Sequence, residues 1–213
     1  MFFESYNQTG RMAKSCEFKL VAGHAALDFA NTLDNRYDPP NAMDLLASYE
    51  DLLGFCEQSA VITRAQAEAL ARRGERDKQD ALQTARALRE AIEGLFSSKA
   101  RDKTPAAEDL GLLNHQVKNV LAHRQLIASA GSFHWSWEGI DRDAQAPVQL
   151  IAFAAAELLA SDTVAFVREC QSETCRWLFL DLSKNHTRRW CDMKLCGNRV
   201  KARRHYQRQS DRV

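Results

Sequence analysis

The chain has 213 residues, of which 45% are hydrophobic and 27% are charged, with only 9 glycines and 4 prolines. This composition is that of an ordinary globular protein, and it excludes an intrinsically disordered chain. The longest apolar stretch, 147–160, is too short to cross a bilayer, and it contains Glu157. No basic region followed by an apolar core opens the sequence, so we expect a cytoplasmic protein.

The net charge of +1 hides an uneven distribution along the chain. Residues 184–213 contain ten Lys or Arg and two Asp, which gives a net charge of +8. Residues 1–183 then carry 19 basic and 26 acidic side chains, a net charge of −7. Such a split predicts two parts with different partners, the basic one suited to a polyanion, although a solvated basic tail would give the same count.

Helical spacing of apolar residues predicts two helices near the N-terminus. The first covers residues 23–33 and is broken by the segment 38–41, and the second covers about 43–58. Polar residues cluster around the first helix and its exit and form a candidate ligand site: Asp28, Asn31, Thr32 and Arg36. We favour the alternative that the first three of them cap a buried helix or tie it down.

Further helices are predicted over residues 63–121. Thr63 and Gln66 have the spacing of a capping box, which begins a helix that ends near Gly74. The clearest apolar stripe follows, over about 77–98. The dipeptide Thr104-Pro105 then predicts an N-cap followed by a proline at the first position of the next helix, which continues to Leu121.

The pattern changes after Arg124. Two short runs, 125–129 and 132–137, flank Ala130-Gly131 and predict a β-hairpin. One face of the second run is aromatic, with Phe133, Trp135 and Trp137. These side chains could line a ligand pocket, but we expect them in the core, because a half-buried strand requires such a face. An apolar helix follows over 147–160, so residues 1–162 are predicted to form a helix-rich α+β domain.

Four cysteines at the C-terminal end carry the strongest chemical signal. They form two Cys-x4-Cys pairs separated by fifteen residues: Cys170, Cys175, Cys191 and Cys196. Two such pairs can present four thiolates tetrahedrally to one structural Zn²⁺. A reducing compartment disfavours disulfides, whereas an iron–sulfur cluster uses the same ligands and stays open as an alternative.

The sequence around the cysteines fits a small metal-stabilised domain over residues 163–213. Strands are predicted over 164–168 and 176–181, and Gly197 allows a close turn beside the metal. A basic helix is predicted over 198–209. The candidate nucleic-acid contacts are Arg188, Arg189, Arg199, Lys201, Arg203, Arg204 and Arg208, of which we expect about half to have structural roles instead. His186 and His205 are expected not to be ligands, because four thiols are available.

These residues also carry a family resemblance. Residues 175–185 (CRWLFLDLSKN), 188–193 (RRWCDM) and 196–204 (CGNRVKARR) closely resemble the CGNR zinc finger, whose name is the tetrapeptide at 196–199. Residues 23–33 (GHAALDFANTL) are similar to the opening of the ABATE domain, which usually precedes that finger. The resemblance implies a bacterial transcription regulator whose four cysteines bind zinc and whose finger binds DNA.

An enzyme and a module that binds protein or RNA are the alternatives to this function. The sequence has no nucleophile elbow, no phosphate-binding glycine loop and no metallohydrolase histidine pair, and a four-thiolate zinc site has no open position for water, so we do not expect an enzyme. A zinc-dependent module that binds a protein or RNA is the alternative to DNA binding. The N-terminal domain is expected to sense a small-molecule effector or to mediate assembly, for example as a homodimer.

Overall fold

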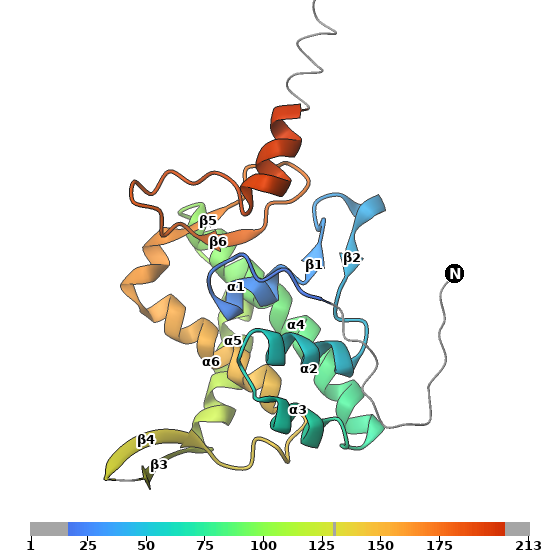
Figure 1. Cartoon of the computed structure of the whole chain (residues 1–213), viewed down its shortest axis with the longest axis vertical. Helices are drawn as coiled ribbons and strands as arrows, with labels where there is room; N and C mark the ends of the chain where they lie inside the picture. The colour runs from blue at the N-terminus through green and yellow to red at the C-terminus, as the bar shows by residue number, and fades with distance from the viewer. Residues whose placement is uncertain (1–16, 130, 203–213) are drawn as a thin grey trace, which may run out of the picture.

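The protein is built around a short buried helix with longer helices packed against it (Figure 1). The computed structural model describes residues 17–129 and 131–202. Its α-helices are α1 (Ala25–Ala30), α2 (Tyr49–Gln58), α3 (Arg64–Leu70), α4 (Glu75–Ala100), α5 (Ala107–Leu121) and α6 (Ala146–Ala160). Shorter helical segments are η1 (Pro39–Asn41), η2 (Asp162–Phe166) and the π-helical η3 (Met193–Gly197).

The strands pair only as antiparallel two-stranded sheets in the described part of the chain. The pairs are β1 (Leu33–Asp34) with β2 (Met43–Asp44), β3 (Arg124–Ser129) with β4 (Ser132–Trp137), and β5 (Val167–Glu169) with β6 (Leu178–Leu180). The helix-rich α+β class is therefore as the sequence predicted. No helix among residues 17–129 and 131–202 is both long and apolar enough to span a membrane.

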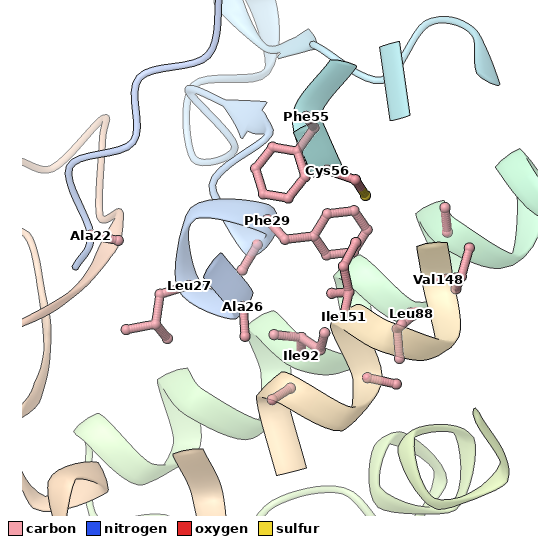
Figure 2. Packing of buried hydrophobic residues seen from close by; sticks show 14 of the residues in the cluster. Ala22, Ala26, Leu27, Phe29, Phe55, Cys56, Leu88, Ile92, Val148 and Ile151 are labelled. Carbon is pink, nitrogen blue, oxygen red and sulfur yellow. The ribbon is translucent and has the colours of Figure 1, made fainter. Parts of the chain in front are cut away.

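Helix α1 occupies the centre of the hydrophobic core. Leu27 and Phe29 on this helix have no exposed surface, and Phe29 packs on Phe55 of α2 with ring centroids 5.4 Å apart. Ile151 of α6 and Ile92 of α4 belong to the same core cluster, and Figure 2 shows both on the side of Phe29 that faces away from Phe55. Burial of apolar surface on all sides of a six-residue helix stabilises a segment that is too short to be helical alone.

Two helix starts differ from the prediction. Helix α2 begins at Tyr49 and not near 43, because residues 43–44 pair with β1 and Ser48 forms a capping box with Asp51. Helix α5 begins at Ala107, and Thr104 does not cap it. In place of a cap, the acidic side chains in its first turn interact favourably with the positive, N-terminal end of the helix dipole.

The remaining helices lie close to their predicted positions. The capping box of Thr63 and Gln66 is confirmed, although α3 ends at Leu70, four residues before the predicted end near Gly74. Helix α4 covers the predicted stripe and extends two residues beyond it at each end. Helix α6 covers the predicted apolar segment with Pro147 in its first turn.

The prediction that the aromatic residues of the hairpin are core residues is wrong for two of them. The hairpin itself forms as predicted, but Phe133 is 73% exposed and Trp135 is 61% exposed. Only Trp137, at the base, packs on the body, with its ring centroid 5.1 Å from that of Phe153 on α6. The strands extend past the helices (Figure 1), so most of the aromatic face has nothing to pack on within the described residues.

Candidate metal centre and basic finger

Four buried thiols converge at one point in the C-terminal segment. The sulfur atoms of Cys170, Cys175, Cys191 and Cys196 all lie within 4.8 Å of one another. The Sγ of Cys191 is 3.6 Å from the Sγ of Cys175 and 3.6 Å from that of Cys196. A tetrahedral ion with metal–sulfur bonds of about 2.3 Å separates its ligands by about 3.8 Å. The arrangement therefore fits one metal ion, and the sulfurs are too far apart for disulfides.

The first cysteine pair lies on a tight turn that follows β5. The amide of Cys170 donates to the carbonyl of Trp177 (2.8 Å), and the amide of Cys175 donates to the carbonyl of Ser172 (3.1 Å). Arg176 has a φ of 52°, which turns the chain so that the amide of Trp177 points at the sulfur of Cys175. Because these residues form the turn, β6 begins at Leu178 and not at 176 as predicted. Residues 162–166 likewise form η2, so β5 begins only at Val167.

The second cysteine pair is held by Asp192 and Gly197. The carboxylate of Asp192 accepts from the amide of Leu195 (2.8 Å), and its carbonyl accepts from the amide of Cys196 (3.0 Å). A Cβ at Gly197 would collide with the Sδ of Met193 and would lie 3.1 Å from the Trp190 ring. The glycine is therefore needed for close side-chain packing next to the last ligand.

The four thiols cannot all ionise together without a cation. Hydrogen bonds from the other three thiols lower the pKa of Cys170. The same contacts raise the pKa of Cys175 and of Cys191, because each of those thiols donates to the ionised sulfur of Cys170. A divalent cation removes this conflict by stabilising four thiolates at once. The donor set thus suits a closed structural metal site.

Asp181 organises the loop between the two cysteine pairs. Its side chain has no exposed surface and accepts from the Ser183 hydroxyl (2.6 Å), the Ser183 amide (3.1 Å) and the Arg188 amide (2.9 Å). Burial alone raises its pKa, but these hydrogen bonds outweigh that effect and hold the pKa of Asp181 below its usual value. His186 stacks on Phe166 in this loop and is not one of the converging ligands.

The finger, residues 167–202 of the described chain, is fixed to the helical domain through β6. The side chain of Asn31 donates to the carbonyl of Leu178 and accepts from its amide, with both distances 2.9 Å. The amide of Leu180 donates to the carbonyl of Ala22 (2.8 Å). Asn31 thus pairs with β6 as a neighbouring strand would, and the apolar residues of both parts form one continuous core.

A second, more exposed contact joins the first cysteine turn to α4. Glu169 of β5 pairs with Arg101, at 3.0 Å from its Nε, and with Arg176, at 3.3 Å. The guanidinium of Arg176 lies 4.3 Å from the Tyr37 ring, and the Tyr37 hydroxyl donates to Glu93 of α4 (3.0 Å). The turn that carries Cys175 is thereby connected to the helical domain on two sides.

The four polar residues near α1 all bond within the protein. Asp28 accepts from the amide of Ala22 (2.9 Å), and burial raises its pKa to about 6. Thr32 donates to the carbonyl of Phe29 (2.7 Å), and Arg36 pairs with Glu90. With the Asn31 contacts, these bonds agree with the interpretation that the cluster ties down a buried helix. A ligand would have to displace them, and its binding here stays a prediction.

The candidate DNA contacts fall into four groups. Arg188 points into the finger, where its Nε donates to the carbonyl of Trp190 (2.8 Å) and its guanidinium lies 4.5 Å from the Phe179 ring. Arg189 is exposed but bonds to Gln171 (2.5 Å). Arg199 and Lys201 are exposed on the helical turn 198–202 that follows the last ligand. The remaining candidates lie outside the described residues: Arg203, Arg204 and Arg208.

One basic residue, Lys194, and the long-range contacts of two other residues were not predicted from the sequence. Lys194 is exposed between two ligands on the second cysteine pair, and it adds to the basic surface. Asn31 and Glu169 fix the finger to the helices, but their partners are 147 and 68 residues away. Asp181 lies in a mostly apolar run, residues 179–183 (FLDLS). An acidic residue in such a run indicates a buried polar contact, and this was a signal that the sequence contained.

A helical domain packed against a basic finger, with four converging cysteines that could bind one metal ion, defines the class of protein that carries a cysteine-rich finger. Residues 23–162 match the ABATE family model, described as "Putative stress-induced transcription regulator", and residues 167–209 match the CGNR zinc finger model. The chain therefore belongs to the ABATE family and carries the CGNR finger that its sequence resembles. Neither is an enzyme family. A search of curated proteins found no match to the chain.

Proposed function

We propose that the protein is a transcription regulator that binds DNA through its finger, which is stabilised by one Zn²⁺. The observation that carries the proposal is that four buried thiols converge next to exposed basic residues. The segment that contains these basic residues has a net positive charge, whereas the rest of the chain has a net negative charge. The closed, four-ligand site gives the ion a structural role, because no position is left for water or substrate.

Zinc is the ion that this site suits best. Thiolate sulfurs select zinc or iron, and a span of 4.8 Å holds one ion, whereas a cluster of several irons and sulfides keeps its thiolates farther apart. The finger family's name supports the same ion. Amide groups that point at the sulfurs of Cys170 and Cys175 would lower the charge on the bound thiolates.

DNA is the partner that the charge distribution favours. Residues 184–213 carry a net charge of +8, and the exposed members among the described residues include Arg189, Lys194, Arg199 and Lys201. Lys and Arg side chains that neutralise phosphates release condensed counterions, which gives strong affinity at low salt. Arg188 is left out of this set, because its guanidinium is engaged inside the finger.

The test is the salt dependence of binding to duplex DNA, measured by fluorescence anisotropy with the full, zinc-loaded chain. The double variant Arg199→Ala/Lys201→Ala should bind more weakly, with a slope of log K against log salt reduced by about 1.8, since two phosphate contacts are lost. The matched control is Arg72→Ala/Lys103→Ala, which removes two exposed basic residues from the helical domain. Equal binding by both variants would contradict the proposed interface.

The rival partners are RNA or an acidic protein that meets the same basic face. Competition distinguishes them, because an excess of duplex DNA displaces such a partner only if both bind the same residues. The helical domain is proposed to serve assembly or effector sensing while its contacts with β6 set the orientation of the finger. We also propose a cytoplasmic location, where reduced thiols are available to the metal.

A further inference from the structure

The β3–β4 hairpin is amphipathic, and its two faces are sharply different. The register pairs Leu126 with Trp135 and Ala128 with Phe133, so these four side chains share one face with Trp137. The other face carries Gln125, Ser129, Ser132, His134 and Ser136, with Ile127 among them. An apolar face of this kind belongs against another apolar surface, because leaving it in water forfeits the hydrophobic effect.

The apolar face is presented to solvent over most of its length. Leu126 is 55% exposed, in addition to the two exposed aromatic rings beyond Trp137, and no described segment covers them. Exposed apolar patches rimmed by polar residues mark interaction sites. In Figure 1 the hairpin projects from the end of the molecule opposite the finger, so this surface is separate from the proposed DNA interface.

The hairpin is held in a fixed direction at its base. The guanidinium of Arg124 lies 4.7 Å from the Trp135 ring, 5.3 Å from the Trp137 ring and 5.0 Å from the Phe153 ring of α6. Cation–π contacts with rings from both the strand and the helix join the hairpin to the body. A surface with a set orientation loses less entropy when it binds a partner.

We propose that this face packs against the same face of a second copy of the chain, so that the hairpins form a dimer interface. Charge supports this choice of partner. Residues 125–137 contain no Lys, Arg, Asp or Glu, so a twofold axis through the face brings no like charges together. Nucleic acid or an anionic membrane would require basic residues, and the one at the hairpin base, Arg124, is occupied by the rings.

The state of the strands points in the same direction. A single two-stranded sheet such as β3–β4 is marginally stable alone, and packing against a second apolar surface stabilises it. Packing two such sheets face to face buries the apolar sides of both. In the dimer the interface would contain Phe133 and Trp135 from each copy, four aromatic side chains of about 150–250 Å² each that are already partly buried. Such an interface is small, so we expect a dissociation constant in the micromolar range.

The experiment is sedimentation equilibrium of the zinc-loaded full chain over a concentration series. The wild type should pass from monomer to dimer mass in the micromolar range. The variant Phe133→Ser/Trp135→Ser should raise the dissociation constant at least about thirtyfold, as expected for the loss of central aromatic contacts. The matched control Gln125→Ala/His134→Ala changes the opposite face and should dimerise as the wild type does.

Circular dichroism and zinc content keep the comparison valid, because both should be unchanged in the two variants. A wild type that stays monomeric at about 200 µM would overturn the proposal, since that concentration exceeds the expected constant. So would dimerisation of the aromatic variant at wild-type strength, or a monomer that instead associates with neutral lipid vesicles. These results are independent of DNA binding, which can fail or succeed separately.

Discussion

The docking of the finger on the helical domain can be tested with the substitution Asn31→Ala. Asn31 is 5% exposed and makes two hydrogen bonds of 2.9 Å to the backbone of Leu178. The alanine leaves a buried amide and a buried carbonyl without this partner. Each unsatisfied group costs about 1–3 kcal/mol, so the free energy of unfolding should fall by about 2–6 kcal/mol.

The same substitution should also weaken metal binding. Leu178 lies three residues after Cys175, and its strand is one of the elements that position the first cysteine turn. If docking and metal binding stabilise each other, each must change the other by the same factor. Zinc affinity of Asn31→Ala should therefore fall, and chelation should lower the stability of the whole wild-type chain and not only that of the finger.

The assay is urea unfolding followed by circular dichroism, with zinc and with a chelator, together with zinc competition against a chromophoric chelator. Asn41→Ala is the matched control, because Asn41 is exposed and bonds only to Asp38 among the described contacts. The control should change the free energy of unfolding by less than about 0.5 kcal/mol. Separate transitions for finger and helices, or an Asn31→Ala chain as stable as the control, would refute the reasoning.

Two further substitutions test individual groups. Burial raises the pKa of Asp28 to about 6 from 3.8, so its charge destabilises the fold above pH 6 and not below pH 4. Asp28→Asn should thus raise the free energy of unfolding at pH 7.5 by up to about 3 kcal/mol. This gain should disappear as the pH is lowered towards 4, and a difference that does not depend on pH would contradict the reasoning. Arg188→Ala should lower zinc affinity and melting temperature, because the contacts of its guanidinium with the finger backbone are lost. Arg199→Ala should lower only DNA affinity. The reverse pattern would show that the two arginines have each other's role.

The parts of the structure that the sequence predicted well depend on short-range spacing. Each cysteine pair closes over four residues, so the turn geometry brings its two sulfurs together wherever the finger lies. The capping box of Thr63 and Gln66 is similarly local. Amphipathic stripes on α4 and α6 also stand out, because a long helix repeats its buried face several times.

The parts that could not be predicted depend on contacts between distant segments. Nothing near Asn31 indicates that its amide pairs with a strand 147 residues later. Alternation in the hairpin gives the correct faces, but not whether another element covers them, and Phe133 and Trp135 are exposed for that reason. Residues 43–44 have apolar neighbours at helical spacing, and only their pairing with β1 makes them a strand.

The central claim is that four cysteines hold one zinc ion and thereby form the finger. It is tested most directly by metal analysis and thiol alkylation of the full chain purified without chelator. We predict one zinc per chain, with Cys170, Cys175, Cys191 and Cys196 protected until a chelator is added. Cys56 should stay unreactive in both cases, since it is fully buried and burial raises its pKa. A chain with no metal and four reactive thiols, or one with iron and visible absorbance, would contradict the claim.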